Sequence, residues 1–223
     1  MTQFVEGFAI GSATIVTTIV FEVLSFSSIQ QLLQKKNGQS LYCRAWIQNI
    51  VNNLVLGPCI YKITVPYFCI YNKQLSLLIR YVQVLILISI HAIGYYFAHF
   101  ALHKPSMYCF HKLHHRFRNI VLPVAANCVS MVEYLIAYMF PFVIGMYVVN
   151  PDRRAMISAV FWVSFANILV HTPWLSSYSM YLPWFFCKTY DHLNHHSKLT
   201  VEYSAPIFSI DHIISKINYK KKN

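Results

Sequence analysis

Five long apolar stretches most constrain what this chain can fold into. They run over residues 7–33, 45–71, 75–102, 121–149 and 155–171. Each is close to the roughly 20 residues that cross the hydrocarbon core of a bilayer as a helix. Because hydrophobic residues make up 57% of the chain, one water-soluble core of this size does not account for them. The sequence therefore predicts an all-α integral membrane bundle with four or five spans.

The first two stretches carry polar or helix-breaking residues. Glu22 lies inside the first, where a carboxyl group is costly, and we interpret it as a packing or register feature because the sequence names no partner for it. The second contains three asparagines near its start, and Pro58 and Pro66 would kink a helix there. The second stretch is therefore the weakest of the five predicted spans.

The net charge of +11 comes from basic residues that flank the apolar stretches. This placement suits lipid headgroups and argues against a nucleic-acid partner. Under the positive-inside rule it predicts five passes with the N-terminus outside and the C-terminus in the cytoplasm. Lys220 and Lys221, fourth and third from the end, resemble a dilysine retrieval signal for the endoplasmic reticulum, although a solvated basic end is an equally good interpretation.

Six cysteines include no C-x-x-C pair, so the sequence predicts no disulfide scaffold and no zinc ribbon. Cys109 and Cys187 lie near histidine clusters and are alternative metal ligands. The other four are interpreted as small apolar core residues.

Most of the 11 histidines fall into three tight clusters. On a helix, positions i, i+3 and i+4 share one face, so each cluster can converge on a metal ion. Two His-x-x-His-His patterns are not accidental, because one is expected by chance on the order of 0.03 times in such a chain. The clusters are His99-x-x-x-His103, His111-x-x-His114-His115 and His192-x-x-His195-His196, and His171 stands alone at the end of the last stretch.

Two predicted spans separate the second cluster from His171, so all the clustered histidines are expected on one side of the membrane. Eight imidazoles exceed the ligand set of one zinc ion, which implies two metal ions. Imidazole suits iron, zinc and copper alike, so the ligand type does not name the metal. His91 and His212 are interpreted as residues that do not bind metal.

The motifs H-F-A-L-H, H-K-L-H-H-R-F and H-L-N-H-H resemble the three histidine boxes of the fatty acid hydroxylase and sterol desaturase superfamily. The resemblance runs from about Tyr95 to Ile213 and includes S-M-V-E at 130–133. The segment A-P-I-F-S-I-D at 205–211 is similar to the closing segment of sterol side-chain hydroxylases of the cholesterol 25-hydroxylase type.

The resemblance implies a di-iron centre facing the cytoplasm that uses dioxygen to hydroxylate or desaturate a lipid, with zinc as a substitute metal. It leaves open a sterol or an acyl-lipid substrate, and hydroxylation or desaturation. The corresponding domain covers residues 75–215, after N-terminal spans at 1–74 and before a basic tail at 216–223. The ligands that it implies are His99, His103, His111, His114, His115, His192, His195 and His196, with His171 as the ninth.

Electrons are expected from separate proteins. The six glycines include no G-x-G-x-x-G pattern for a flavin or nicotinamide, and the chain has no room for a fused haem domain. A cytochrome b-type donor and an NAD(P)H-dependent reductase are therefore the predicted partners, and the basic loops suit an acidic donor.

The sequence departs from the family pattern at three places. Residues 91–94 stand where an aspartate often precedes the first box, and Phe100 follows His99 where arginine is common. Residues 202–204 read Glu-Tyr-Ser in place of Asn-aromatic-Gly. Glu133 and Glu202 could orient ligand imidazoles, but we interpret both as ordinary polar residues.

Two other functions compete with an oxygenase. A catalytically inactive zinc-binding membrane protein of the same fold would account for the departures, but it gives no reason for complete histidine boxes. A metal transporter would place its ligands at mid-membrane depth, whereas these histidines follow the ends of spans.

Overall fold

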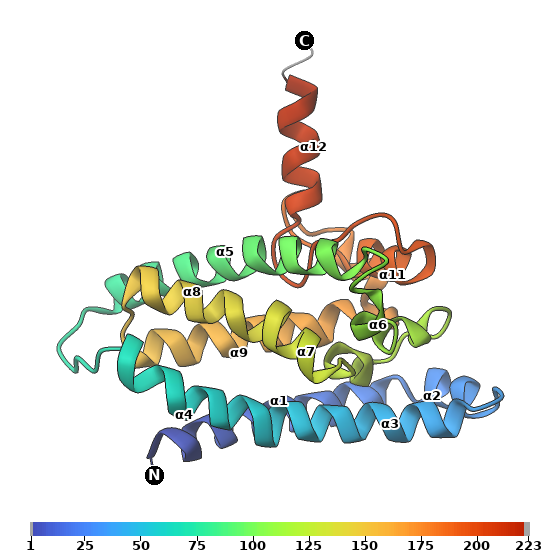
Figure 1. Cartoon of the computed structure of the whole chain (residues 1–223). Coiled ribbons are helices and arrows are strands. Elements are labelled where there is room, and N and C mark those ends of the chain that lie inside the picture. The colour runs from blue at the N-terminus through green and yellow to red at the C-terminus, as the bar shows by residue number, and fades with distance from the viewer. Residues whose placement is uncertain (1, 221–223) are drawn as a thin grey trace.

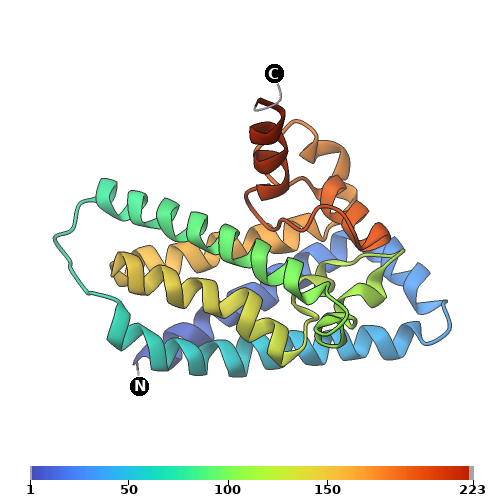
Figure 2. The same cartoon turned by 45° about the horizontal axis from the view of Figure 1, so that its top comes forward.

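Five long helical rods lie side by side in the computed structural model, which describes residues 2–220 (Figures 1 and 2). No strand occurs among these residues, and two isolated β-bridges are the only extended pairings in them. The rods are α1 (Thr2–Leu24), α3 (Gly38–Ile50) continued by η1 (Val51–Leu56) and α4 (Gly57–Phe68), α5 (Leu77–Leu102), α7 (Met131–Glu133) continued by η4 (Tyr134–Met139) and α8 (Phe140–Val149), and α9 (Arg153–Val170).

Shorter helices gather at one end of the bundle, where α6 and α11 lie, while α12 projects away from it (Figures 1 and 2). The start of α1 and the loop between α4 and α5 lie at the opposite end (Figure 1). The shorter helices are α2 (Phe26–Leu33), α6 (Tyr108–His111), η2 (His114–Phe117), η3 (Pro123–Asn127), η5 (Pro173–Leu175), α10 (Ser176–Ser179), α11 (Thr189–Lys198) and α12 (Ile210–Lys220).

Four helices are long and apolar enough to cross a membrane: Thr2–Leu24, Leu77–Leu102, Met131–Val149 and Arg153–Val170. Many large apolar side chains on them are exposed in the isolated chain, which suits contact with lipid. The predicted all-α membrane bundle is confirmed, and the chain is an integral membrane protein.

The second predicted stretch forms a continuous rod of α3, η1 and α4 but is not one of these four helices, because its polar residues make the rod less apolar. Its asparagines explain the departure. The side-chain amide of Asn49 donates to the Val124 carbonyl at 3.2 Å, and that of Asn52 donates to the Asn127 and Val129 carbonyls at 3.1 Å each. These buried amides fix the rod against the loop that follows the second histidine box.

Two predicted boundaries were wrong. The stretch at 7–33 is two helices, because α1 ends at Leu24 and a bend at Ser25 precedes α2. The stretch at 121–149 becomes a long helix only from Met131, because its first ten residues form a loop with the short helix η3. That loop is buried against α1 and α3, so its apolar composition reflects a protein core and not lipid contact.

Glu22 has two partners that the sequence did not reveal. Its Oε1 accepts a hydrogen bond from the Val124 backbone N–H at 2.7 Å, and its Oε2 accepts one from the Tyr42 hydroxyl at 2.8 Å. The side chain is buried, so the two donors replace the water that it loses. Glu22 therefore ties α1 to the buried loop and to α3.

Two predictions concern the C-terminal segment, namely the boundary of the tail and the retrieval signal. Helix α12 runs through the predicted boundary between domain and tail at 215 and 216. Lys221, one of the two lysines of the retrieval signal, lies outside the described residues, so the signal stays a prediction. All six cysteines are free, which agrees with the absence of a disulfide scaffold.

Candidate metal centre

The nine predicted ligand residues come from four places that the fold brings to one end of the bundle. The last turn of α5 carries His99, and His103 is its C-terminal cap. His171 caps α9 in the same way, so both long helices end at the histidines. The second box follows α5 on α6 and η2, and the third lies on α11.

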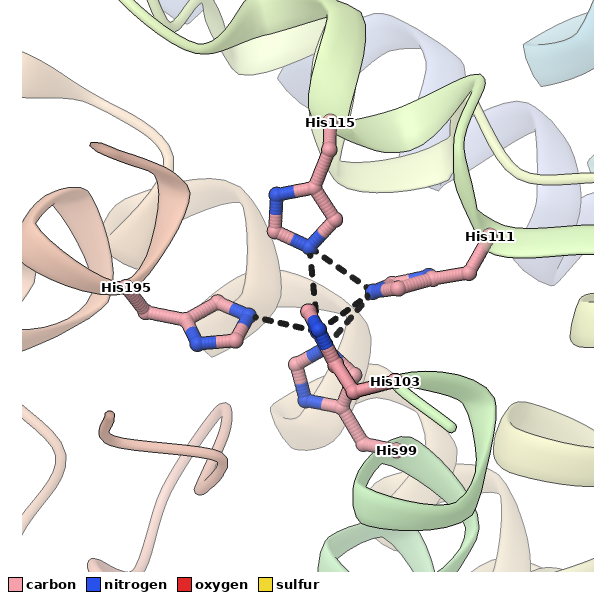
Figure 3. Close-up of side chains that lie close together, drawn as sticks. All are labelled: His99, His103, His111, His115 and His195. Atoms are coloured by element: carbon pink, nitrogen blue, oxygen red, sulfur yellow. Dashed lines mark hydrogen bonds between the residues drawn. The ribbon is translucent and has the colours of Figure 1, made fainter. Parts of the chain in front are cut away.

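The histidines form two groups, within each of which the facing ring nitrogens lie no more than 4.8 Å apart. The groups adjoin, since the ring centroids of His115 and His196 are 4.9 Å apart. The five-histidine group, drawn in Figure 3, contains His99, His103, His111, His115 and His195, and the four-histidine group contains His114, His171, His192 and His196.

Each His-x-x-His-His box divides between the two groups, whereas the spacing alone predicts that the three histidines of a box can converge on one metal ion. His111 and His115 join the five-histidine group, whereas His114 joins the other. In the third box His195 joins the five-histidine group, whereas His192 and His196 join the four-histidine group. Adjacent residues on a helix point about 100° apart, so neighbouring histidines cannot aim at the same ion.

The Nε2 atoms of the five-histidine group converge on one point (Figure 3). The His111 Nε2 lies 2.8 Å from that of His115, 2.9 Å from that of His99 and 3.1 Å from that of His103. The His195 Nε2 lies 3.2 Å from that of His103. Nitrogens bound about 2.1 Å from one metal ion lie about 3 Å apart, so this spacing fits a shared ion.

The outer ring nitrogens fix which nitrogen carries the proton. Nδ1–H of His99 donates to the Tyr203 carbonyl at 2.8 Å, and that of His195 donates to the Val201 carbonyl at 2.6 Å. A carbonyl oxygen only accepts, so the Nε2 atom of each neutral ring presents a bare lone pair to the centre. Several buried lone pairs at this distance repel one another unless a cation lies between them, and the residues therefore fit a metal ion.

The four-histidine group has the same construction. The His171 Nε2 lies 2.9 Å from that of His192 and 3.4 Å from that of His114. Nδ1–H of His171 donates to the Asn167 carbonyl at 2.7 Å, and that of His114 donates to the Ala125 carbonyl at 3.1 Å. This group can hold a second metal ion beside the first.

Burial sets the protonation of the ligands. It lowers the pKa of His103 to about 3 and the pKa values of His171 and His195 to about 4. Burial, followed by the neighbouring imidazoles, also holds the pKa values of His114 and His192 well below their ordinary range. The rings are therefore neutral at pH 7, which is the state that binds metal.

Glu133 orients an imidazole of the candidate centre, so its interpretation as an ordinary polar residue is wrong. Its Oε1 accepts a hydrogen bond from Nδ1–H of His111 at 2.7 Å, and both side chains are buried. A carboxylate in this position fixes the imidazole and increases its affinity for a cation. Glu202 does not contact either group and lies 3.7 Å from the His212 ring, so the ordinary interpretation holds for it.

The side chains at residues 202–204 differ from the family pattern, but the backbone of this segment still supports the centre. Glu202 adopts a φ of 55°, in the left-handed region that asparagine tolerates better than most residues. The next residue, Tyr203, supplies the carbonyl that accepts from His99. The segment thus supports a ligand through its main chain, whichever side chains it carries.

The remaining candidates lie outside both groups. Cys109 is exposed, and the buried Cys187 thiol donates to the Ser204 carbonyl at 3.3 Å. His91 is buried within α5, and His212 accompanies Asp191 at the surface.

Sequence reasoning missed the groups that hold the ligands in place, apart from Glu133. Four of these supporting groups are the backbone carbonyls of Ala125, Asn167, Val201 and Tyr203. Every residue has a carbonyl, so no sequence signal could have identified them.

A family model described as fatty acid hydroxylase matches residues 84–215, which is more than half of the chain and includes all nine histidines. No curated protein and no solved structure matches the chain.

Proposed function

We propose that the chain, which belongs to the fatty acid hydroxylase family, is a membrane di-iron oxygenase that hydroxylates or desaturates a lipid. One observation carries the proposal: nine histidines converge as two adjoining groups at the end of an apolar helical bundle. A soluble substrate would not require a centre at the end of membrane helices.

Bound iron would supply the oxidising power that side chains lack, because an unactivated C–H bond offers nothing for an acid or base to attack. The protein's own residues hold and orient the ligands. Glu133 compensates part of the cationic charge at His111. Backbone carbonyls fix four other rings, those of His99, His114, His171 and His195. The surrounding buried residues exclude water, which protects the reaction from side products.

His103 marks the open side of the centre. It is the one member of the nine that is not buried, while the other eight are 5% exposed or less. We infer that lipid and dioxygen approach the five-histidine group from the side of His103. Family membership and the lipid-facing bundle support this route equally for a sterol and for an acyl lipid.

The proposal includes a location and partners. The histidine end and the C-terminus face the cytoplasm, in the endoplasmic reticulum if the organism is eukaryotic, and a cytochrome b-type donor with its NAD(P)H-dependent reductase delivers the electrons. The basic flanks of the spans support this orientation.

The first experiment counts metal. The protein is purified in detergent, and iron and zinc per chain are measured by mass spectrometry for the parent and for His114→Ala and His195→Ala. About two irons in the parent, with a loss in each variant, support the di-iron reading. Zinc that neither substitution removes would contradict it and favour an inactive zinc-binding protein.

The second experiment tests the reaction. The iron-loaded protein in lipid vesicles receives a donor, a reductase and NAD(P)H, and lipid products are analysed by mass spectrometry under ¹⁸O₂. Incorporation of ¹⁸O into a lipid indicates hydroxylation, and loss of two hydrogens indicates desaturation. Donor-dependent oxidation in the parent and none in His195→Ala is the expected result.

A further inference from the structure

A groove with a volume of about 490 Å³ lies beside the second histidine box, outside the metal centre. One wall is the face of α3 and η1 that carries Arg44 and Val51. The opposite wall is the segment of α6 and η2 that carries Phe110, Lys112 and Arg116. The start of α7 closes one end.

The cations line the same groove from two separate segments of the chain. Arg44 and Val51 are seven residues apart, which places them two turns apart on one face of their rod. Lys112 follows α6 and Arg116 lies in η2, and both line the opposite wall. The groove therefore receives positive charge from both sides.

These cations have no acidic neighbour to neutralise them. The groove lining contains no aspartate or glutamate. Arg44, Lys112 and Arg116 are exposed, and none of them forms an ion pair within the described part of the chain. Three adjacent cations repel one another, so the groove is complementary to an anion.

The walls and the closed end of the groove also carry apolar side chains. Val51 and Met131 are 37% and 54% exposed, and Phe110 is half-buried beside them. Met131 is also the first residue of a candidate membrane span, so the groove lies where that span ends. Anionic headgroups and the first methylenes of their chains occupy this level of a bilayer.

We propose that the groove binds the headgroup of an anionic phospholipid. The lipid phosphate lies among Arg44, Lys112 and Arg116, and one acyl chain follows Val51, Phe110 and Met131 into the bilayer. A recess that combines cations with apolar side chains at the end of a candidate membrane span suits such an amphiphile. Because Lys112 and Arg116 adjoin His111 and His115 in the chain, the lipid would also fix the second box.

Native mass spectrometry tests the proposal independently of any reaction. The detergent-purified protein is mixed with equal amounts of phosphatidylserine and phosphatidylcholine, and the lipids retained per chain are counted. The parent is expected to retain phosphatidylserine preferentially, and Arg44→Gln with Arg116→Gln to lower that retention about 30-fold. The matched control is Lys35→Gln with Lys36→Gln, which removes two exposed lysines elsewhere and should retain lipid like the parent.

Cys109 provides a second readout, because its exposed thiol lines the groove. Vesicles with phosphatidylserine should slow maleimide labelling of Cys109 relative to neutral vesicles. Labelling of Cys43, which is exposed but outside the groove lining, should not change. Lys112→Gln, with one charge removed, serves if the double variant does not fold, and about a fivefold loss of phosphatidylserine is expected.

Equal lipid retention by the parent and the groove variant would overturn the proposal. Unchanged lipid retention together with lost binding of an acidic cytochrome b-type donor would assign the groove to a protein partner instead. Displacement of the lipid by an equal concentration of inorganic phosphate would show that the apolar side chains of the groove contribute nothing, and would also overturn the proposal.

Discussion

The two histidine groups use the same ligand but differ in access and charge. The five-histidine group includes His103, which is partly exposed, and has the Glu133 carboxylate behind His111. Every member of the four-histidine group is 0% exposed, and no carboxylate contacts it among the described residues. Under the proposed function, the open, charge-compensated group would meet substrate and the closed group would complete the centre from behind.

Ligand removal gives the largest expected effect on this comparison. His111→Ala should lower metal affinity in the five-histidine group about 1,000-fold, and His192→Ala should do the same in the other group, since each imidazole carries a large share of the binding energy. Mass spectrometry should find about one metal ion per chain in each variant instead of about two. Complete loss of metal from either variant would show that the two groups bind as a single cooperative site.

Acid should lower the stability of the metal-free protein through both histidine groups alike. His171 and His195, one from each group, have folded-state pKa values of about 4, below the ordinary value of about 6.5. The unfolded chain therefore binds more protons below pH 6.5, and stability falls as the pH drops from about 6.5 towards 4. Together the two residues should cost the metal-free protein about 3 kcal/mol at pH 5.5.

The measurement is the thermal unfolding of metal-free protein in detergent at pH 7.5 and 5.5, with His171→Asn and His195→Asn as matched variants. Each variant should lose part of the pH dependence, by a similar amount. If the pH dependence of thermal unfolding vanished in only one of the two variants, folding would bury the two histidine groups to different extents.

Glu133→Gln should affect only the five-histidine group. The amide oxygen still accepts from His111, but the negative charge is lost, and metal affinity should fall about 10- to 100-fold. The matched control is Glu202→Gln, which touches neither group. Titration with iron under anaerobic conditions measures both, and equal affinities in the two variants would contradict the role of Glu133.

The smallest expected effect concerns Glu22, which supports the four-histidine group from a distance. It accepts from Val124, the residue before the Ala125 carbonyl that holds His114. Glu22→Gln weakens this support by about 1 kcal/mol, which lowers metal affinity at the four-histidine group about fivefold. Metal titration of the variant should leave the five-histidine group unchanged, and equal losses in both groups would show a general loosening of the fold.

Sequence alone determined the class of fold and the residues of the centre. Apolar length predicts membrane helices because a bilayer imposes a fixed thickness, and four of the predicted stretches overlap candidate spans. Histidine spacing identified eight of the nine residues that the structure brings together, and the family resemblance added His171. Both signals are local, so periodicity and composition are sufficient to detect them.

Tertiary structure alone decided how the histidines divide and what supports them. Whether His114 joins its neighbour His115 or faces His171 depends on where the end of α9 lies relative to the second box, which no local pattern records. The apolar residues at 121–130 also looked like a span, because burial in a protein core and burial in lipid require the same composition. Long-range contacts, such as Asn52 with the carbonyls of that loop, distinguish the two environments.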